Sequence, residues 1–336
     1  MDFLFLSGMP KVQYTKPALN LVAQLQQLKN RGLIVKSDAK ALHLLQNISY
    51  YRLSGYWYPM LATPKSAHNF KPQSTLEAVF KLYCFDRELR QMVLGELEKI
   101  EVAVRAKMIY EMSHRHGAFW YTVSALFANQ GTHASTLTNI SKEFSRTDEK
   151  FIADFKKKYS DPMPPSWMMI EITSFGSLSM LFQNLQLPHD KRAIAHSFGV
   201  DDSTFASWLH SIVYVRNVCA HHSRLWNRVM RISPKVPMNP GHRWISVTTI
   251  PNQVAGGSPI NLNNRMYFFL SMIVYLLNII NPKNTFKQRL FKLLQKYPLV
   301  NVKAMGFPQG WESELLWDGE NVMPWYKKLL SRVSIN

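Results

Sequence analysis

The chain has 336 residues, of which 46% are hydrophobic and 18% are charged, a composition typical of folded globular proteins and not of disordered ones. Lys and Arg outnumber Asp and Glu by 40 to 22, so the formal net charge at pH 7 is +18. This charge favours a polyanionic partner, with nucleic acid as the first candidate and an anionic membrane surface as the second.

The N-terminal segments predict small helices followed by an aromatic cluster. Apolar residues three positions apart predict a helix from about residue 19 that ends at Gly32, and Ser37 opens a second helix. An aromatic run around Arg52 follows, with the sequence YYRLSGYWYP over residues 50–59. These rings and the guanidinium can stack on unpaired RNA bases, but packing between the small helices is the favoured interpretation. Arg52 is kept as an exposed candidate for RNA contact.

A long helix is predicted after the polar loop at residues 64–72. Ser74 and Glu77 have capping-box spacing, and the helix that they open extends to about His114. Arg105 on this helix is a candidate contact for RNA phosphate, oriented by Glu101, although a plain ion pair between the two is at least as well supported. His114 and His116 near its end are expected to be surface or helix-dipole residues.

The rest of the chain also reads as mainly helical. The clearest break lies at residues 161–165 (DPMPP), and residues 233–262 are rich in Pro and Gly, which predicts a long loop with a hairpin around residues 244–250. Helices are expected at residues 133–158 (one or two), 166–185, 189–198, 204–226, 263–280, 285–296 and near 325–333. The fold class is therefore all-α, with an irregular loop or hairpin insertion. The expected division is residues 1–72, 73–282 and 283–336.

Cysteine usage and hydropathy indicate the cellular setting. Cys84 and Cys219 are far apart and form no CxxC pair, which favours a reducing, cytoplasmic location. Residues 1–6 (MDFLFL) make a poor signal peptide. Residues 266–280 are strongly apolar, but 15 residues fall short of the roughly 20 that span a bilayer. We therefore expect a buried core helix there and no stable membrane insertion.

One third of the chain lacks acidic residues. Residues 203–311 contain no Asp or Glu, whereas the chain average predicts about 7 (109 × 22/336), and the same residues contain 13 Lys or Arg. Within this segment lies the run RNVCAHH, residues 216–222. Carboxylates would be needed to hold Mg²⁺, so the segment argues against a two-metal nuclease unless Asp86, Glu98 or Glu101 folds into the site.

The residue types in this run suit metal-free cleavage of RNA. The 2′-hydroxyl attacks the adjacent phosphorus, which requires a base, an acid and positive charge on the phosphorane. His221 is predicted as the general acid or base and Arg216 as the group that stabilises the phosphate. On a regular helix Arg216 and His221 lie about 140° apart, and one helix supplies one suitably placed histidine. We therefore expect a composite site in a homodimer. The alternative is a core helix on which these are ordinary surface residues.

The predicted helix at residues 285–296 is basic and amphipathic. Its cations are candidates for RNA binding, as is Arg224 after the motif, although a membrane-surface helix or a plain solvated helix has the same pattern. No Gly-rich phosphate loop, Ser/His/Asp order or metal-ligand cluster stands out, so neither a cofactor nor a metal is expected. The cations of this helix are Lys287, Arg289, Lys292 and Lys296.

The run from Arg216 to His221 resembles the signature of the HEPN ribonuclease superfamily. Other segments resemble the Abi-like (abortive infection, AbiD/AbiF) phage-defence family within it, in an order that covers roughly residues 16–280. They include YYRLSGY (50–56), FDRELR (85–90), EKIEVAVR (98–105) and HHSRLWN (221–227).

This resemblance implies a HEPN-like helical bundle with metal-independent endoribonuclease activity at paired Arg/His motifs. It also implies a role in limiting phage spread and, for AbiF-like members, association with a small structured non-coding RNA. Carried over by position, Arg216 and His221 are the catalytic pair and Asn217 is the residue that orients and supports them. The adjacent His222 is expected to be a second supporting residue. The alternative is a non-catalytic module that sequesters a regulatory RNA or a partner protein.

Overall fold

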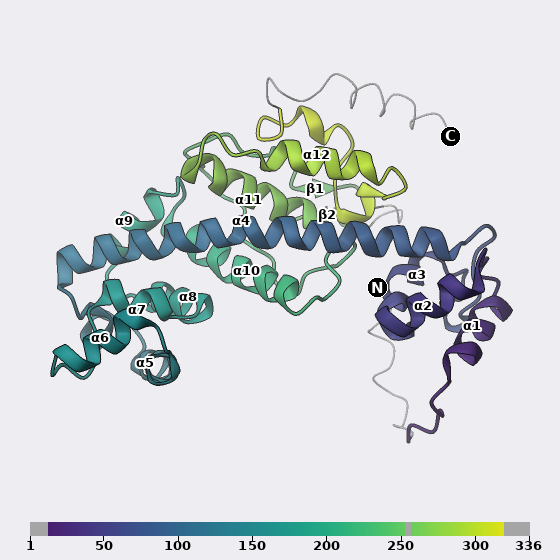
Figure 1. Cartoon of the computed structure of the whole chain (residues 1–336). Helices are drawn as coiled ribbons and strands as arrows, with labels where there is room; N and C mark the ends of the chain where they lie inside the picture. Colours follow the sequence, from purple (N-terminus) through teal and green to yellow (C-terminus); the bar gives the residue numbers. More distant parts are fainter. Residues whose placement is uncertain (1–12, 253–256, 319–336) are drawn as a thin grey trace. The chain divides into compact units, whose positions relative to one another are not determined.

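The computed structural model describes residues 13–252 and 257–318, and over these it is mostly helical, as predicted. The described residues form twelve α-helices and one two-stranded hairpin (Figure 1). The chain divides into two compact units, Met1–Cys84 and Phe85–Asn336. The helix α4 (Leu76–His116) begins in the first unit and continues into the second. The predicted all-α class is confirmed, and the predicted three-part division stays a prediction.

The N-terminal unit contains α1 (Leu21–Asn30), α2 (Asp38–Ile48) and α3 (Tyr50–Trp57). The hydroxyl of Ser37 accepts a hydrogen bond from the backbone N–H of Lys40 at 3.3 Å and so caps α2, as its sequence indicated. Leucines from all three helices pack into the core of this unit. These buried leucines are Leu25, Leu28, Leu44, Leu45 and Leu53.

The aromatic cluster of α3 is divided between core and surface. Tyr56 and Trp57 are buried, and the ring of Trp57 meets that of Tyr50 edge-on at 4.9 Å. These contacts confirm the packing interpretation for this part of the cluster. Tyr51, in contrast, is 89% exposed and Arg52 is also exposed. Tyr58, at the end of the run, is 43% exposed, so the outward residues of the cluster are Tyr51, Arg52 and Tyr58.

The long helix α4 starts one residue later than its capping signal suggested. The hydroxyl of Thr75 accepts a hydrogen bond from the N–H of Ala78 at 3.1 Å, whereas Ser74 donates to the carbonyl of Met60 at 3.4 Å. The predicted capping box is therefore wrong, because the cap is Thr75 and the residue three positions on is alanine. At 41 residues, α4 is about 60 Å long.

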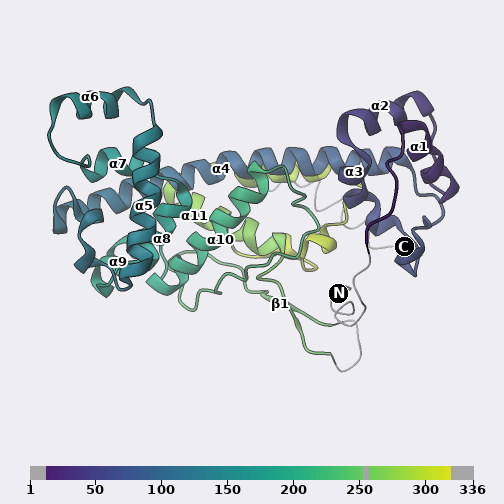
Figure 2. The same ribbon diagram turned by 90° about the horizontal axis from the view of Figure 1, so that it is seen from below.

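The second unit arranges eight further helices along α4. In the view of Figure 1, α12 lies above α4 and α10 below it, and Figure 2 shows α5 to α9 gathered near the C-terminal end of α4. α8 packs on both α5 and α10, and α9 packs on α10. The eight helices are α5 (Gln130–Arg146), α6 (Lys150–Lys158), α7 (Ser166–Ile172), α8 (Phe175–Asn184), α9 (Pro188–His196), α10 (Asp202–Ala220), α11 (Met266–Ile280) and α12 (Phe286–Lys296).

Two sequence predictions in this unit need adjustment. Residues 166–185 form two helices, because the hydroxyl of Ser174 caps a new one by accepting from the N–H of Ser177 at 3.3 Å. The hairpin in the insertion exists but is short and lies further along, with β1 (Thr249–Ile250) antiparallel to β2 (Ile260–Asn261). The predicted helix near residues 325–333 lies outside the described residues.

The apolar helix α11 forms the centre of the second unit. Every residue from Met266 to Leu277 is buried, which confirms the predicted core helix. In the ranges that the structure covers, no helix is both long enough and apolar enough to cross a membrane. The apolar face of α12 is also buried inside the protein, so that face is not available to a membrane surface.

Candidate functional site

The helix α10 carries the Arg/His motif, and its start is fixed by a strong cap. The carboxylate of Asp201 accepts a hydrogen bond from the N–H of Thr204 at 2.8 Å. Burial raises the pKa of Asp201, but the hydrogen bonds from the Thr204 hydroxyl and from backbone N–H groups outweigh it, so the pKa is lowered. The inward face of the helix is apolar. It consists of Phe205, Trp208, Leu209, Ile212, Val215, Val218 and Cys219.

The motif ends in a tight left-handed turn. His222 has φ 54° and its N–H bonds the carbonyl of Cys219 at 3.0 Å, while the N–H of Ser223 bonds the carbonyl of Val218 at 3.0 Å. This Schellman pattern stops the helix at residue 220, so the predicted end at residue 226 is wrong. The turn places His221 at the C-cap, with φ −84° and ψ 11°.

A buried carboxylate on α4 holds the chain that leaves this turn. Asp86 is fully buried and accepts hydrogen bonds from the backbone N–H of Leu225 at 3.0 Å and of Trp226 at 2.7 Å. It also pairs with the guanidinium of Arg90, itself only 5% exposed. We call Asp86 and Arg90 the α4 clamp. The clamp fixes the segment after His222 to α4 and thereby fixes the end of the motif.

The cysteine inside the motif faces inward. Burial raises the pKa of Cys219 to about 12, while the charge of Arg90 lowers it and that of Asp86 raises it. A thiol with such a pKa is protonated at neutral pH and is not a nucleophile. Cys219 is therefore a packing residue beside the α4 clamp.

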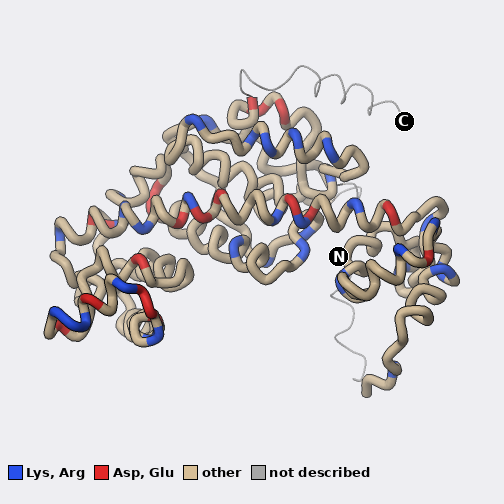
Figure 3. Tube along the Cα trace, in the orientation of Figure 1, with Lys and Arg blue, Asp and Glu red and all other residues tan. Residues whose placement is uncertain are grey.

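The polar residues of the motif face outward together. Arg216, Asn217 and His221 are all exposed, and in the described ranges their side chains form neither a hydrogen bond nor an ion pair. Asn217 and His221 are four positions apart and so lie on one face of α10, whereas Arg216 lies on the neighbouring edge. In Figure 3 the end of α10 and the loop after it carry blue and no red, in agreement with the acid-free sequence.

Arg105 is not part of this exposed set. It is only 8% exposed, and its guanidinium donates hydrogen bonds to the carbonyl of Ile170 and to the carboxylate of Glu101. The alternative that Arg105 forms a plain ion pair with Glu101 is therefore the correct one. Arg105 is no longer a candidate for RNA contact. Arg52 is exposed on α3, in the other unit, and Arg224 is half-buried just after the motif.

The basic helix α12 uses two of its four cations to pack on α4 and a third to hold a carbonyl further along the chain. Arg289 pairs with the buried Glu96, and Lys296 pairs with Glu88 at 2.8 Å. Lys287 donates to the carbonyl of Leu316 at 3.2 Å, and burial lowers its pKa. Lys292 is exposed and makes no hydrogen bond or ion pair in the part of the chain that the structure covers. Of the four predicted RNA contacts on this helix, Lys292 is thus the one best placed for RNA.

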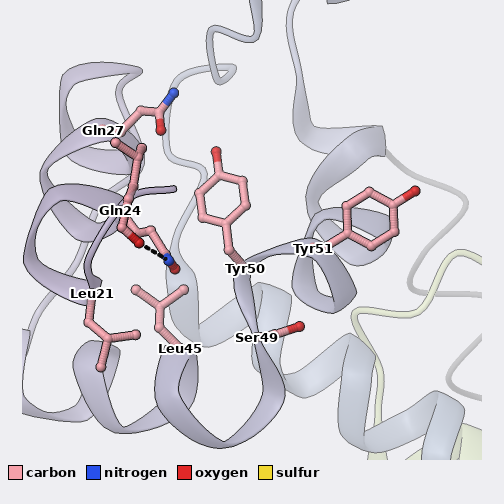
Figure 4. A pocket seen from close by; sticks show the side chains of 8 residues that line it. Leu21, Gln24, Gln27, Leu45, Ser49, Tyr50 and Tyr51 are labelled. Atoms are coloured by element: carbon pink, nitrogen blue, oxygen red, sulfur yellow. Dashed lines mark hydrogen bonds between the residues drawn. The ribbon is translucent and has the colours of Figure 1, made fainter. Parts of the chain in front are cut away.

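A separate hollow of about 360 Å³ lies on the N-terminal unit. Figure 4 shows Gln24 and Gln27 of α1 on one side and Tyr50 and Tyr51 of α3 on the other. Its lining is mainly apolar, but Tyr50 is tied to Arg31 by a 2.7 Å hydrogen bond and Gln24 to the carbonyl of Leu19 at 2.8 Å. Tyr51 alone keeps a broadly exposed ring for stacking.

The model of the Abi-like protein family matches residues 43–227, which is 185 of the 336 residues (227 − 43 + 1). The chain belongs to the Abi-like family. Membership implies a part in abortive infection, a form of phage defence. The match contains the α4 clamp and ends at residue 227, directly after the two N–H groups that Asp86 holds. No curated protein and no solved structure matches this Abi-like chain.

Proposed function

We propose that this Abi-like protein is a metal-independent endoribonuclease that acts as a homodimer. The observation that carries the proposal is the outward edge of Arg216, Asn217 and His221 at the fixed end of α10. The guanidinium and imidazole of this edge have no partner among residues 13–252 and 257–318, and they lie in a segment free of acidic residues. Such groups suit a phosphodiester substrate.

The chemistry assigned to the edge is transesterification. One imidazole removes the proton of the 2′-hydroxyl as this oxygen attacks phosphorus, and a second, protonated imidazole gives a proton to the departing 5′-oxygen. The P–O5′ bond breaks, leaving a 2′,3′-cyclic phosphate and a 5′-hydroxyl. Arg216 stabilises the negative charge on the phosphorane through its guanidinium, and Asn217, on the face of His221, orients the imidazole.

The need for two proton-transfer groups supports a dimer. One copy of α10 offers one histidine on the edge, so a second copy related by a two-fold axis would supply the other. The exposed side of α10 is a suitable surface for such contact, because its outward residues follow helical spacing. His210, Asn217 and His221 on this side are exposed, and Tyr214 between them is half-buried.

Three carboxylates of α4 were the candidates for holding Mg²⁺ at the motif, namely Asp86, Glu98 and Glu101. Their surroundings support the proposal of metal-free chemistry. Asp86 does lie beside the motif, but it is occupied by Arg90 and two backbone N–H groups. Glu101 is paired with Arg105, and Glu98 is an exposed residue of α4. Binding Mg²⁺ through Asp86 would require the α4 clamp to be broken.

RNA is the proposed partner, both as substrate and as a bound small structured non-coding RNA. The residues proposed to contact its backbone are Arg224 and Lys292 in the second unit and Arg52 in the first. Binding through them would weaken with salt, because phosphate contacts release counterions. The proposed location is the cytoplasm, where both RNA and reducing conditions are found.

The test is cleavage of structured and unstructured RNA by the full chain in the presence of EDTA. Parent protein should cleave and leave 2′,3′-cyclic phosphate ends, whereas Arg216→Ala and His221→Ala should lose at least about 100-fold in rate, as expected for a lost acid–base group. His196→Ala and Arg192→Ala, at exposed positions of α9, are the matched controls and should cleave like the parent. Equal cleavage by parent and both motif variants would overturn the proposal.

The same exposed cations also support a second function, the binding of a regulatory RNA without cleavage. The specific observation is that Lys292 and Arg216 are exposed and pair with no group in the described part of the chain, so both can contact phosphate whether or not cleavage follows. RNA that binds with salt-dependent affinity and stays intact in every buffer tested, at protein concentrations where the chain is dimeric, would favour this alternative. RNA that co-purifies with the protein fits both functions.

A further inference from the structure

A cluster of nitrogen and oxygen ligands forms where α4 ends and α9 begins. The Nε2 atom of His116 lies 2.8 Å from one carboxylate oxygen of Asp190, and the Nε2 atom of His189 lies 3.1 Å from the other. The ligand atoms of all three side chains lie within 4.8 Å of one another. Two imidazoles are thus aimed at a single carboxylate from two helices that are far apart in sequence.

Local backbone geometry produces this convergence. His116 is the last residue of α4, and Gly117, with φ 82°, turns the chain away at once. Pro188 begins α9 and places Asp190 in its first turn. Asp190 is buried, its side chain only 2% exposed, whereas His116 is 17% and His189 is 62% exposed. A buried carboxylate is therefore reached from solvent past two imidazoles.

We propose that His116, His189 and Asp190 bind a divalent transition-metal ion of the zinc type. Two imidazole nitrogens and one carboxylate oxygen are a donor set that Zn²⁺ takes, with water in the fourth position. In a tetrahedral shell with bonds of about 2.0 Å, neighbouring ligand atoms lie about 3.3 Å apart. The two imidazoles contact different oxygens of Asp190, His116 at 2.8 Å and His189 at 3.1 Å, while the ligand atoms of all three side chains lie within 4.8 Å of one another. A turn of the carboxylate or of the exposed His189 ring would therefore bring both imidazoles and one oxygen around an ion.

Arg115 also reaches this carboxylate and must be accommodated. Its guanidinium lies 3.1 Å from Asp190 and 3.0 Å from Glu111. Arg115 and His189 contact the same oxygen of Asp190, whereas His116 contacts the other one. Arg115 would keep its hydrogen bond to the first oxygen and orient the carboxylate, and the oxygen that faces His116 would bind the ion. Without a metal, the same groups form a network that neutralises a buried aspartate. This network is the competing explanation that the experiment must separate.

The metal site lies far from the proposed catalytic edge. Asp86 holds the segment after the motif, and His116 is 30 residues further along α4 (116 − 86), which is about 45 Å at helical rise. An ion here would join the end of α4 to the start of α9 and would not touch the scissile phosphate. The proposal is therefore independent of the proposed nuclease and remains testable if the protein cleaves no RNA.

The experiment is a metal titration of the full chain after treatment with a chelator and its removal. Zn²⁺ is titrated in competition with a chromophoric chelator, and Co²⁺ serves as a spectroscopic probe through its visible absorption. We expect one equivalent to bind and to raise the melting temperature, as any ligand of the native state does. His189→Ala is the decisive variant, because His189 is exposed and its removal leaves the pair of Arg115 and Asp190 intact.

The variants separate a built site from adventitious binding by surface histidines. His116→Ala and His189→Ala should lower Zn²⁺ affinity at least tenfold and abolish the melting shift. His114→Ala and His196→Ala remove exposed histidines from the same two helices and should behave like the parent. The proposal is overturned if the parent binds no stoichiometric ion, or if His189→Ala binds it as tightly as the parent does. Either result assigns the cluster to the hydrogen-bond network.

Discussion

Asp86 is the residue whose removal tests the account of the motif most severely. Its carboxylate is fully buried and satisfies three groups at once: the N–H of Leu225, the N–H of Trp226 and the guanidinium of Arg90. Asp86→Ala removes the carboxylate that pairs with the buried charge of Arg90, and breaking such a buried pair costs about 3–5 kcal/mol. Each stranded N–H group adds roughly 1–3 kcal/mol unless water enters. We therefore expect a loss of at least about 3 kcal/mol.

This loss is large enough to measure in two ways. For a domain of this size, 1 kcal/mol corresponds to a shift of about 2–4 °C in the melting temperature, so Asp86→Ala should melt at least about 6 °C below the parent. Urea unfolding followed by circular dichroism gives the free energy directly. Asp86→Asn keeps an acceptor for one N–H but loses the charge, and should cost about 1.5–3 kcal/mol. Asp161→Ala, at an exposed loop position, is the control and should stay within about 0.5 kcal/mol.

A double-mutant cycle identifies the source of the loss. Asp86→Ala combined with Arg90→Met should cost less than the sum of the two single changes, because neither partner is then left charged and buried alone. At a temperature where Asp86→Asn is folded, its RNA cleavage should also fall, since the turn after His221 is no longer held. An Asp86→Ala protein that unfolds within about 1 kcal/mol of the parent would refute the clamp.

Three further changes test the helix that carries the motif and the helix that covers α4. Asp201→Asn should lower the free energy of unfolding by up to about 1 kcal/mol at pH 7. Because the pKa of Asp201 is lowered in the folded chain, the stabilisation is complete above the unfolded pKa of this carboxyl and disappears as pH falls through the folded one. Urea unfolding should therefore show the gap between variant and parent closing as the pH falls below the ordinary range of an aspartate, and a constant gap would contradict the cap. His222→Gly should leave stability unchanged or raise it by about 1 kcal/mol, since glycine adopts φ 54° without steric cost, whereas His222→Val should melt earlier than the parent; equal melting of the two variants would argue against the left-handed turn. Lys292→Gln should lower the slope of log RNA affinity against log salt concentration by about 1 without a change in melting temperature. Arg289→Gln should instead lower the melting temperature, because its partner Glu96 is buried. An unchanged salt slope for Lys292→Gln would remove α12 from the RNA surface.

Local signals predicted most of the helices, because caps and apolar spacing act within a few residues. Ser37 starts α2 and the apolar run from Met266 forms the buried α11. The end of α10 was misplaced because the left-handed turn is made by His222 and not by glycine. Histidine is enriched at left-handed positions relative to most residues, so His222 could have indicated a helix end. The apolar residues that follow it, Leu225 and Trp226, instead suggested that the helix continues.

The sequence predicted the residue types of the candidate site, but it did not predict the hydrogen bonds from α4 that hold the end of the motif in place. The motif residues lie next to one another in sequence, whereas Asp86 and the N–H of Leu225 are 139 residues apart, and no local pattern joins them. The same holds for Arg105, whose guanidinium reaches a carbonyl 65 residues away, and for His116, which meets Asp190 74 residues later. Such contacts depend on how α4 runs beside the other helices, which spacing within one segment does not specify.

The most direct test of the composite site is cleavage by mixed dimers. A fixed amount of parent protein is equilibrated with increasing His221→Ala protein, and the RNA cleavage rate per parent chain is measured in EDTA. If each phosphodiester needs one imidazole from each copy, mixed dimers are inactive and the rate per parent chain falls toward zero as the variant comes into excess. A rate per parent chain that stays constant across the titration would contradict the account, because one copy of α10 would then be sufficient for catalysis.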